Sequence, residues 1–408
     1  MLSRRSTLLA AAAVAALLGG AQARAADKVV KVGIAVSLTG ADANSAQLHE
    51  DGVKLALMEA NESHAVKGIK FEPYTLDDGT ATAGQYDPAQ AAINARKFVG
   101  DKSVIAIVGP DMSGSAKAMA PILNEGNLSM ITGSATNPDL TDPKFAAQYS
   151  PSGKVTFFRT VATDGYQGPY MANFFADKLG VKSVYILDDS GAYGEGLANA
   201  FEKQAIAKGI KVLGHDKLDA KAADYAAVMT KIKALNPDAL FYGGVMQAGV
   251  KVAKQSYDAM PHIKKGGGDG IIDGQMFTGA GYPAAEGWYG SVAAPHTIDD
   301  PKLAKWVAKY KETFKVAPDD YAVASYDAAQ AIIAATKKLV AEKKPVNRDN
   351  IQAELMKVKI NTLQGPVAFD EHGDIQNKVV SVFQAHQSPG PLDDVSVQYK
   401  YIGVAPQS

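Results

Sequence analysis

Two turns rich in hydroxyl side chains carry the clearest chemical signal in this chain. VIAIVG (104–109) is an apolar run that leads into a turn with Ser113, and NLSMIT (127–132) leads into a turn with Ser134 and Thr136. Each turn sets hydroxyls beside free backbone N–H groups near the start of a helix, where an anion is stabilised. Either turn alone is equally typical of an ordinary helix cap. Two adjacent turns of this kind favour a site for an anion or a zwitterion.

A similar turn in the second half of the chain carries Tyr193. The segment DDSGAYGEG (188–196) follows the apolar run VKSVYIL (181–187) and leads into a helical pattern over 194–209. A lone tyrosine in such a place is more often a packing residue. Because it follows a strand, as the hydroxyl turns of the first half do, we expect two α/β lobes that close over a small ligand.

The remaining motifs give no catalytic or metal-binding set. The seven histidines lack metal-ligand spacing and are interpreted as surface or packing residues. Ser113 lacks the first glycine of a nucleophile elbow, and GGGDG (266–270) is neither a P-loop nor a dinucleotide fingerprint. The paired acids at 77–78 are typical of solvated or capping residues. Since the chain also has no cysteine, we predict a binding protein rather than an enzyme, without a cofactor or metal.

The order of the apolar runs predicts an α/β protein with mainly parallel sheets. Strand-like and helix-like segments alternate four times between residues 29 and 141, and a second alternating set begins at residue 181. A loop-like stretch between the two sets is interpreted as approaching a crossover between domains. The expected strands are 29–40, 68–79, 104–109, 127–132, 181–187 and 238–244, and the expected helices include 49–61, 88–99, 194–209, 301–314, 321–341 and 347–358.

Two later segments have composition-based interpretations. KKGGGDGII (264–272) is rich in glycine and lysine, which indicates a flexible segment that ends in a short apolar run. PVAFDEHGD (366–374) and KVVSVFQAH (378–386) are two short runs with a polar stretch between them, and this pattern predicts a hairpin-like pair.

The N-terminus has the pattern of an export signal. Two arginines precede a short apolar stretch (7–20), and the triplet Ala-Arg-Ala (23–25) offers a cleavage site. We therefore expect a signal peptide over 1–25, cleaved near Ala25, and a mature protein in the periplasm. Three of the 42 basic residues lie in that segment, so 39 basic and 43 acidic residues remain. This slight negative net charge does not indicate nucleic-acid binding, which calls for a basic surface.

Motifs spread over the whole mature chain carry a family resemblance. They are VGIAVSLTG, YTLDDG, IVGPDMSGS, MITGSATNPDLT, FFRTVATDGYQG, DDSGAYGEGLANAF, DYAAVMTKIKALNPDALFYGG, GGDGI, AAEGWYGS and VAFDEHGD. Together they resemble the Leu/Ile/Val-type periplasmic amino-acid-binding proteins, the substrate-binding subunits of branched-chain amino acid ABC importers. The resemblance implies a type I periplasmic binding protein fold, with two Rossmann-like lobes and a three-stranded hinge. The implied boundaries are 26–158 and 294–377 for lobe one, and 159–293 and 378–408 for lobe two.

The resemblance also implies roles for five residues. Ser113, through its hydroxyl and nearby backbone N–H groups, is expected to bind the ligand α-carboxylate together with Thr136. The carbonyl of Ser134 and the hydroxyl of Thr136 are expected to meet the α-ammonium from lobe one. Tyr193 is expected to close over the ligand from lobe two, and Asp269 to pair with the ammonium. A buried zwitterion needs donors for its carboxylate and an anion for its ammonium.

Three departures from the family pattern bear on specificity. Ser45 stands where the family often has an aromatic lining residue, and 245–246 (Val-Met) replaces another aromatic. Both changes leave more room for a ligand side chain, so a larger or aromatic amino acid fits as well as a branched-chain one. Met112 stands at one position of the family's usual lobe-one disulfide.

These observations predict an exported solute-binding protein that captures a small amino acid and delivers it to the membrane permease of an ABC importer. A monomer is the expected form, with no nucleic-acid partner. The same fold binding an aromatic acid, urea or a short amide is an alternative, and so is a ligand sensor for a membrane partner.

Overall fold

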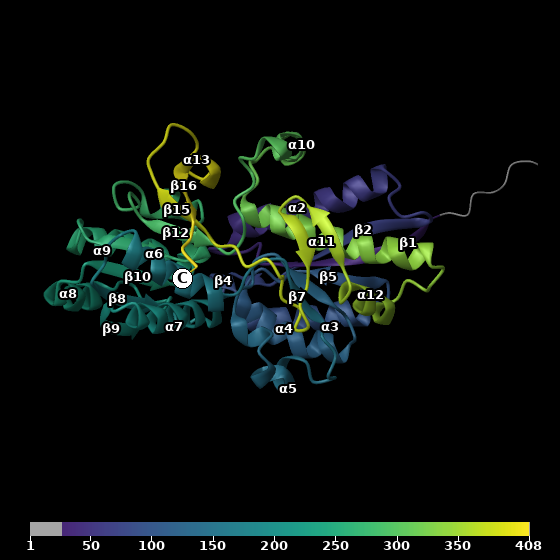
Figure 1. Ribbon diagram of the computed structural model, residues 1–408, viewed down its shortest axis with the longest axis horizontal. Helices are drawn as coiled ribbons and strands as arrows, with labels where there is room; N and C mark the ends of the chain where they lie inside the picture. Colours follow the sequence, from purple (N-terminus) through teal and green to yellow (C-terminus); the bar gives the residue numbers. More distant parts are fainter. Residues whose placement is uncertain (1–26, 408) are drawn as a thin grey trace, which may run out of the picture.

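The computed structural model describes residues 27–407, which form two lobes side by side, each built on its own sheet (Figure 1). We call the lobe with the five-stranded sheet the first lobe and the lobe with the seven-stranded sheet the second lobe. The expected signal peptide, residues 1–25, lies outside the described residues. Within residues 27–407, no helix combines the length and the apolar character that crossing a membrane requires.

The sheet of the first lobe is entirely parallel, in the order β2-β1-β5-β6-β7. Every residue of its central strand β5 is buried, as expected for a strand covered on both faces. Pro73 lies in β2, at the sheet edge, where a missing N–H breaks no ladder. The strands are β1 (Lys28–Val36), β2 (Ile69–Asp77), β5 (Val104–Val108), β6 (Met130–Thr132) and β7 (Phe157–Arg159).

Helices cover both faces of this sheet. The long helices α2 and α11 pack together over one face, and α3 and α4 pack together over the other. The predicted start of α3 is confirmed, because the Asp87 carboxylate accepts from the N–H of Ala89 and Pro88 is the first helical residue. The helices are α2 (Ala43–Glu62), α3 (Pro88–Gly100), α4 (Ser113–Glu125), α5 (Ala146–Tyr149), α10 (Ala304–Phe314), α11 (Asp320–Ala341) and α12 (Arg348–Leu355).

The sheet of the second lobe has the order β16-β15-β12-β11-β10-β8-β9. Its strands are parallel from β9 to β12, and the two C-terminal strands β15 and β16 join antiparallel. The predicted α/β class with mainly parallel sheets is therefore confirmed. The elements are α6 (Asp164–Asp177), β8 (Ser183–Asp188), α7 (Ala192–Ala207), β9 (Lys211–Lys217), α8 (Ala226–Leu235), β10 (Ala239–Gly243), α9 (Met246–Ala259), β11 (Lys264–Gly267), β12 (Tyr289–Val292), β15 (Ser381–Ala385), α13 (Val395–Gln398) and β16 (Tyr399–Val404).

The chain passes between the two sheets three times, after β7, after β12 and before β15. The N–H of Ala162 on the first passage donates to the carbonyl of Ala293 on the second at 2.8 Å. The hydroxyl of Ser381, at the end of the third passage, donates to the carbonyl of Ala294 at 2.8 Å. The three passages therefore lie together, which is the arrangement a hinge requires. The exact lobe boundaries given above remain predictions.

The glycine-rich segment 264–272 is not flexible, contrary to its composition. Its first part is strand β11, which is buried between β10 and β12, and a 3-10 helix over Asp269–Ile271 follows. A Cβ atom at Gly266 would lie 2.7 Å from the carbonyl oxygen of Tyr289, and one at Gly267 would lie 2.5 Å from that of Tyr242. The glycines are needed because neighbouring backbones approach closely.

The hairpin predicted from 366–374 and 378–386 is also wrong. The first run contributes β14 (Gly365–Ala368), which pairs with β13 (Lys359–Thr362) beside the first lobe. The second run contributes β15, which pairs with β12 and β16 in the second lobe. The third passage between the lobes separates the two runs, and a local pattern of apolar residues does not reveal which strand a run will pair with.

We predict that Gly267→Ala lowers the free energy of unfolding by about 2 kcal/mol, because the new methyl group meets a strand that cannot move aside. Urea unfolding of the purified protein, followed by circular dichroism, measures this change. Gly100→Ala is the matched control, since no atom lies within 4 Å of a Cβ at Gly100. Equal stability of the two variants would contradict the packing argument.

Candidate functional site

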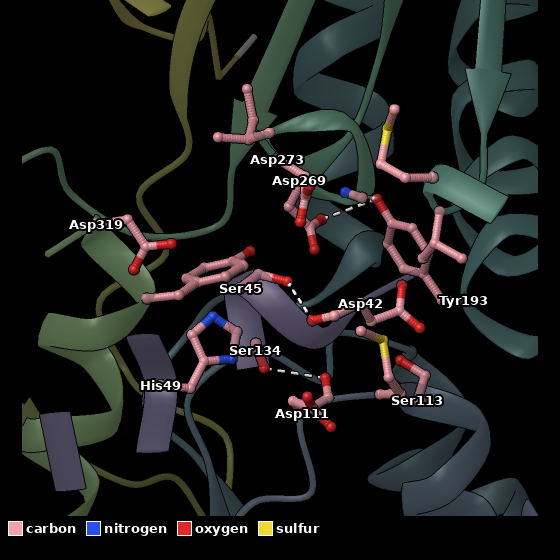
Figure 2. Close-up of a pocket in the computed structure, with 16 residues that line it drawn as sticks. Asp42, Ser45, His49, Asp111, Ser113, Ser134, Tyr193, Asp269, Asp273 and Asp319 are labelled. Atoms are coloured by element: carbon pink, nitrogen blue, oxygen red, sulfur yellow. Dashed lines mark hydrogen bonds between the residues drawn. The ribbon is translucent and has the colours of Figure 1, made fainter. Parts of the chain in front are cut away.

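A cavity of about 540 Å³, a volume that includes space open to solvent, lies where the two lobes meet (Figure 2). Its walls come from loops at the carboxyl ends of β5, β6, β8 and β10, from the segment after β11, and from the starts of α2 and α11. This is the edge at which open α/β sheets bind ligands. The first lobe contributes Asp42, Ser45, His49, Asp111, Met112, Ser113, Ser134, Asp319 and Tyr321, and the second Tyr193, Val245, Met246, Asp269, Gly270, Ile272 and Asp273.

Four of the five expected site residues line this cavity, namely Ser113, Ser134, Tyr193 and Asp269. Thr136 is not among the lining residues. Its side chain is fully buried, and its carbonyl accepts from the N–H of Asp164 at 2.9 Å. The two hydroxyl turns therefore do meet at one site, but Thr136 does not line the cavity, and its Oγ1 has no hydrogen-bond partner within residues 27–407.

Ser113 brings backbone donors to the cavity because it is the first residue of α4. The preceding Met112 makes no side-chain cap, so the first N–H groups of the helix are not taken by one. The Ser113 hydroxyl accepts from the N–H of Asn137 at 3.2 Å, and its own O–H remains free to donate. These groups and the helix dipole suit a carboxylate.

Asp269 is held in a fixed orientation on the opposite wall. Its Oδ1 accepts from the hydroxyl of Tyr193 at 3.0 Å (Figure 2). The side-chain amide of Gln167 donates to the same oxygen. The N–H of Gly270 in turn donates to the Tyr193 hydroxyl at 3.0 Å. Removal from bulk water raises the pKa of Asp269 above its ordinary value. A positioned carboxylate of this kind suits an ammonium group.

The cavity is strongly acidic. Five aspartates line it (Asp42, Asp111, Asp269, Asp273 and Asp319), whereas its walls contain no lysine or arginine. None of the five forms an ion pair with another group in residues 27–407. Burial and the nearby Asp273 raise the pKa of Asp42 to about 7, and burial with neighbouring acids raises that of Asp319 to about 7. The site therefore favours positive charge.

Sequence reasoning missed four of these acids and the histidine beside them. Asp319 caps α11, and Asp111 accepts from the backbone N–H and the hydroxyl of Ser37. His49, interpreted as a surface or packing residue, is 5% exposed, and neither ring nitrogen has a hydrogen-bond partner in the described part of the chain. Burial lowers the pKa of His49 to about 4. No local signal marks these residues, because only the fold brings them together.

The residues that depart from the family pattern do line the cavity. Ser45, Met112, Val245 and Met246 all contribute to its wall. Ser45 is small, and its hydroxyl donates to the carbonyl of Asp42 at 3.0 Å. The expected consequence, more room for a ligand side chain, remains a prediction.

Hydrogen bonds between the lobes hold the cavity closed. The side-chain amide of Asn137 donates to the carbonyl of Ala192 at 2.6 Å, and that of Gln247 donates to the carbonyl of Ala83 at 2.7 Å. Each bond joins a side chain of one lobe to the backbone of the other. This structure therefore represents a closed arrangement of the lobes.

Comparison with known proteins gives the same class. The family model described as "Periplasmic binding protein" matches residues 29–388. The leucine-, isoleucine-, valine-, threonine- and alanine-binding protein of Pseudomonas aeruginosa is 28% identical over 385 residues, which cover 94% of this chain and 96% of that protein. The Leu/Ile/Val-binding protein homolog 3 of Brucella melitensis is 31% identical over 264 residues, or 65% of this chain and 67% of that protein.

Solved structures share the fold. A leucine-binding protein of Thermotoga maritima superposes with a TM-score of 0.77 at 24% identity, covering 92% of this chain and 98% of that one. A solute-binding protein of R. palustris in complex with benzoate gives a TM-score of 0.75 at 20% identity, covering 93% and 98%. The chain belongs to the periplasmic binding protein family, whose members are binding proteins. Its curated relatives are of the Leu/Ile/Val type, which confirms the resemblance seen in the sequence.

We predict that the ligand-free protein loses stability relative to Asp42→Asn as the pH rises from about 4 to about 7. In this window the unfolded Asp42, with its ordinary pKa of 3.8, has lost a proton that the folded protein keeps. The difference grows by up to about 1.4 kcal/mol per pH unit. Urea unfolding at several pH values measures it, with Asp177→Asn, a surface acid paired with Lys208, as control. Parallel pH profiles for wild type and Asp42→Asn would contradict the assignment.

Proposed function

We propose that this chain is a periplasmic solute-binding protein that captures a single amino acid between its lobes and delivers it to the membrane permease of an ABC importer. The observation that carries the proposal is a closed cavity between two lobes, with free donors on one wall and a positioned carboxylate on the other. The P. aeruginosa relative is named for binding amino acids, which supports the same class of ligand. Binding and release, with no chemical step, are the whole of this activity.

In this proposal the two ends of the zwitterion bind to different lobes. The α-carboxylate accepts from the Ser113 hydroxyl and the first N–H groups of α4, and the α-ammonium donates to Asp269 from the second lobe. The carbonyl of Ser134 is a further acceptor for the ammonium. Tyr193 closes over the ligand, and Thr136 acts only by supporting the wall.

The same division explains closure. A ligand shifts an open–closed equilibrium only as far as it binds one state better than the other. Here, a ligand bound by Ser113 alone meets Asp269 and Tyr193 only after the lobes approach each other. The three passages that lie together between the sheets serve as the hinge, and the expected lobe boundaries fall near them.

Binding of a simple aromatic acid, as in the R. palustris structure with benzoate, is the less favoured function. Such a ligand has a carboxylate but no cation. It would leave Asp269 and its acidic neighbours buried beside an anion, which costs free energy. The acidic lining therefore favours an amino acid.

We predict that Asp269→Asn weakens binding of the cognate amino acid by about 30-fold or more, because it leaves the ammonium without its anion. Isothermal titration calorimetry, after a thermal-shift screen of the common amino acids, measures the affinity. The matched ligand is the carboxylic acid that lacks only the amino group, whose binding should hardly change. Asp177→Asn controls for general loss of negative charge. An equal loss for both ligands would show that Asp269 does not meet the ammonium.

A further inference from the structure

The cavity holds more carboxyl groups than one α-ammonium can pair with. Besides Asp269, it is lined by Asp42, Asp273 and Asp319, which belong to a separate group. Asp273 acts electrostatically on both Asp42 and Asp319, raising their pKa values, whereas Asp269 is bound to Tyr193 and Gln167. These three acids, which we call the second group, therefore add carboxyl groups beyond the one assigned to the α-ammonium.

The carboxylates of the second group are only partly satisfied. The carboxylate of Asp42 accepts from the N–H of Tyr86 at a long 3.4 Å. That of Asp273 accepts from the N–H of Gln275, two residues further along the chain, at 2.7 Å. That of Asp319 accepts from a backbone N–H of α11 at 2.6 Å. An ionised carboxylate has room for about four hydrogen bonds. Each of the three side chains thus has acceptor positions left for a ligand.

Two nearby aspartates outside this group, by contrast, are each paired with a histidine. Asp320 follows Asp319 directly, and its Oδ2 lies 2.8 Å from Nδ1 of His296. The other ring nitrogen of His296 contacts Asp299 at 3.0 Å. His296 thus compensates two acids, whereas no such partner faces Asp42, Asp273 or Asp319 within the described chain.

His49 is the independent sign that a ligand belongs here. It lies on α2, lines the cavity and is almost fully buried, yet neither nitrogen has a partner in residues 27–407. Its ring packs edge-on against Tyr321 with centroids 5.8 Å apart. A neutral imidazole has one donor and one acceptor, and leaving both unpaired in the interior costs free energy. A polar group in the cavity would satisfy them.

The position of His49 separates this region from the zwitterion site. In Figure 2, His49 and Asp319 lie at the left of the cavity, whereas Asp42 lies at the right with Ser113 and Tyr193. The elements agree with the picture, because α2 and α11 pack together in the first lobe, whereas Ser113 and Tyr193 begin α4 and α7. The side chain of an amino acid held at the right can therefore point toward the unpaired groups at the left.

We propose, resting on the proposed amino-acid site, that the ligand is an amino acid whose side chain ends in a cationic nitrogen group facing His49 and Asp319. Asp42 and Asp273 add the negative charge that balances it. The acceptor nitrogen of His49 takes one N–H of this group, and the carboxylate of Asp319 takes another. A basic amino acid with an ammonium or guanidinium group has this chemistry.

Matched pairs of ligands test the second charge directly by calorimetry on the purified protein. L-Lysine is compared with L-norleucine, and L-arginine with L-citrulline, since each pair differs chiefly in the side-chain charge. We expect the charged member of at least one pair to bind about 100-fold more tightly than its neutral partner. Neutral ligands that bind as tightly as the charged ones in both pairs would overturn the inference while leaving the amino-acid site intact.

The variant Asp319→Asn tests whether Asp319 binds the charged end of the ligand side chain. Asparagine at this position preserves the helix cap. We expect it to weaken the preferred basic ligand by about 30-fold and the neutral partner by less than about 3-fold. Asp42→Asn provides a second variant outside the cap, and Asp177→Asn is the control that should change neither affinity. Equal effects on both members of the pair would overturn the assignment of Asp319.

A diamine without a carboxylate separates this inference from the proposed function. If cadaverine binds as tightly as lysine, the result would support the site for a side-chain cation near His49 and Asp319. It would contradict the role of Ser113, because cadaverine has no carboxylate. Absence of binding by any amino acid or diamine in the panel would overturn both proposals. His49→Phe, which keeps a ring but removes both nitrogens, should weaken only the basic member of the pair.

Discussion

A set of buried carboxyl groups without a matching cation is the constraint on which the rest of this structure depends. Five aspartates face one closed cavity, and their partners in the described chain are backbone N–H groups and neutral side chains. Removing a carboxylate from water costs several kcal/mol, which weak hydrogen bonds offset only in part. The apolar cores on both faces of each sheet supply the stability that keeps these acids in place. A cation in the cavity therefore stabilises the closed protein.

The same constraint connects the fold to the motion of the lobes. The acids come from both lobes: Asp42 and Asp319 from the first, Asp269 and Asp273 from the second. Closing the lobes without a ligand brings like charges together in a medium of low dielectric constant, whereas closing over a cation turns that repulsion into attraction. The lobes can make this movement because only three adjacent passages of the chain connect the sheets. Charge thus makes closure depend on what the cavity contains.

Solved structures that share this fold are named for different ligands. The solved structures superpose over more than nine-tenths of this chain, yet their ligands include leucine and benzoate. The sheets and helices give all of them loops at the carboxyl ends of parallel strands. Ser45 and Val245 are among the positions that line the cavity here. Fold alone therefore identifies the class of protein, and the cavity lining identifies the ligand chemistry.

Much of this protein follows from the sequence by itself. The apolar runs and their alternation with helical patterns are local features, so the α/β class, the cap at Asp87 and the hydroxyl turn at Ser113 are readable without coordinates. Family motifs added Asp269 and Tyr193, which do lie together. The pairing of β15 and the burial of β11 were not readable, because strand partners are set by distant segments.

The acidic character of the cavity also arises only from tertiary structure. Asp42, Asp273 and Asp319 lie far apart along the chain, and Asp273 and Asp319 have ordinary local roles in a turn and a helix cap. Local sequence does not distinguish a capping aspartate in solvent from one that faces a closed cavity. His49 is similarly indistinguishable from a core histidine until its missing partners are seen. The sequence determined which elements form, and the packing of two lobes decided which charges meet, because electrostatic interactions depend on distance in space and not on separation along the chain.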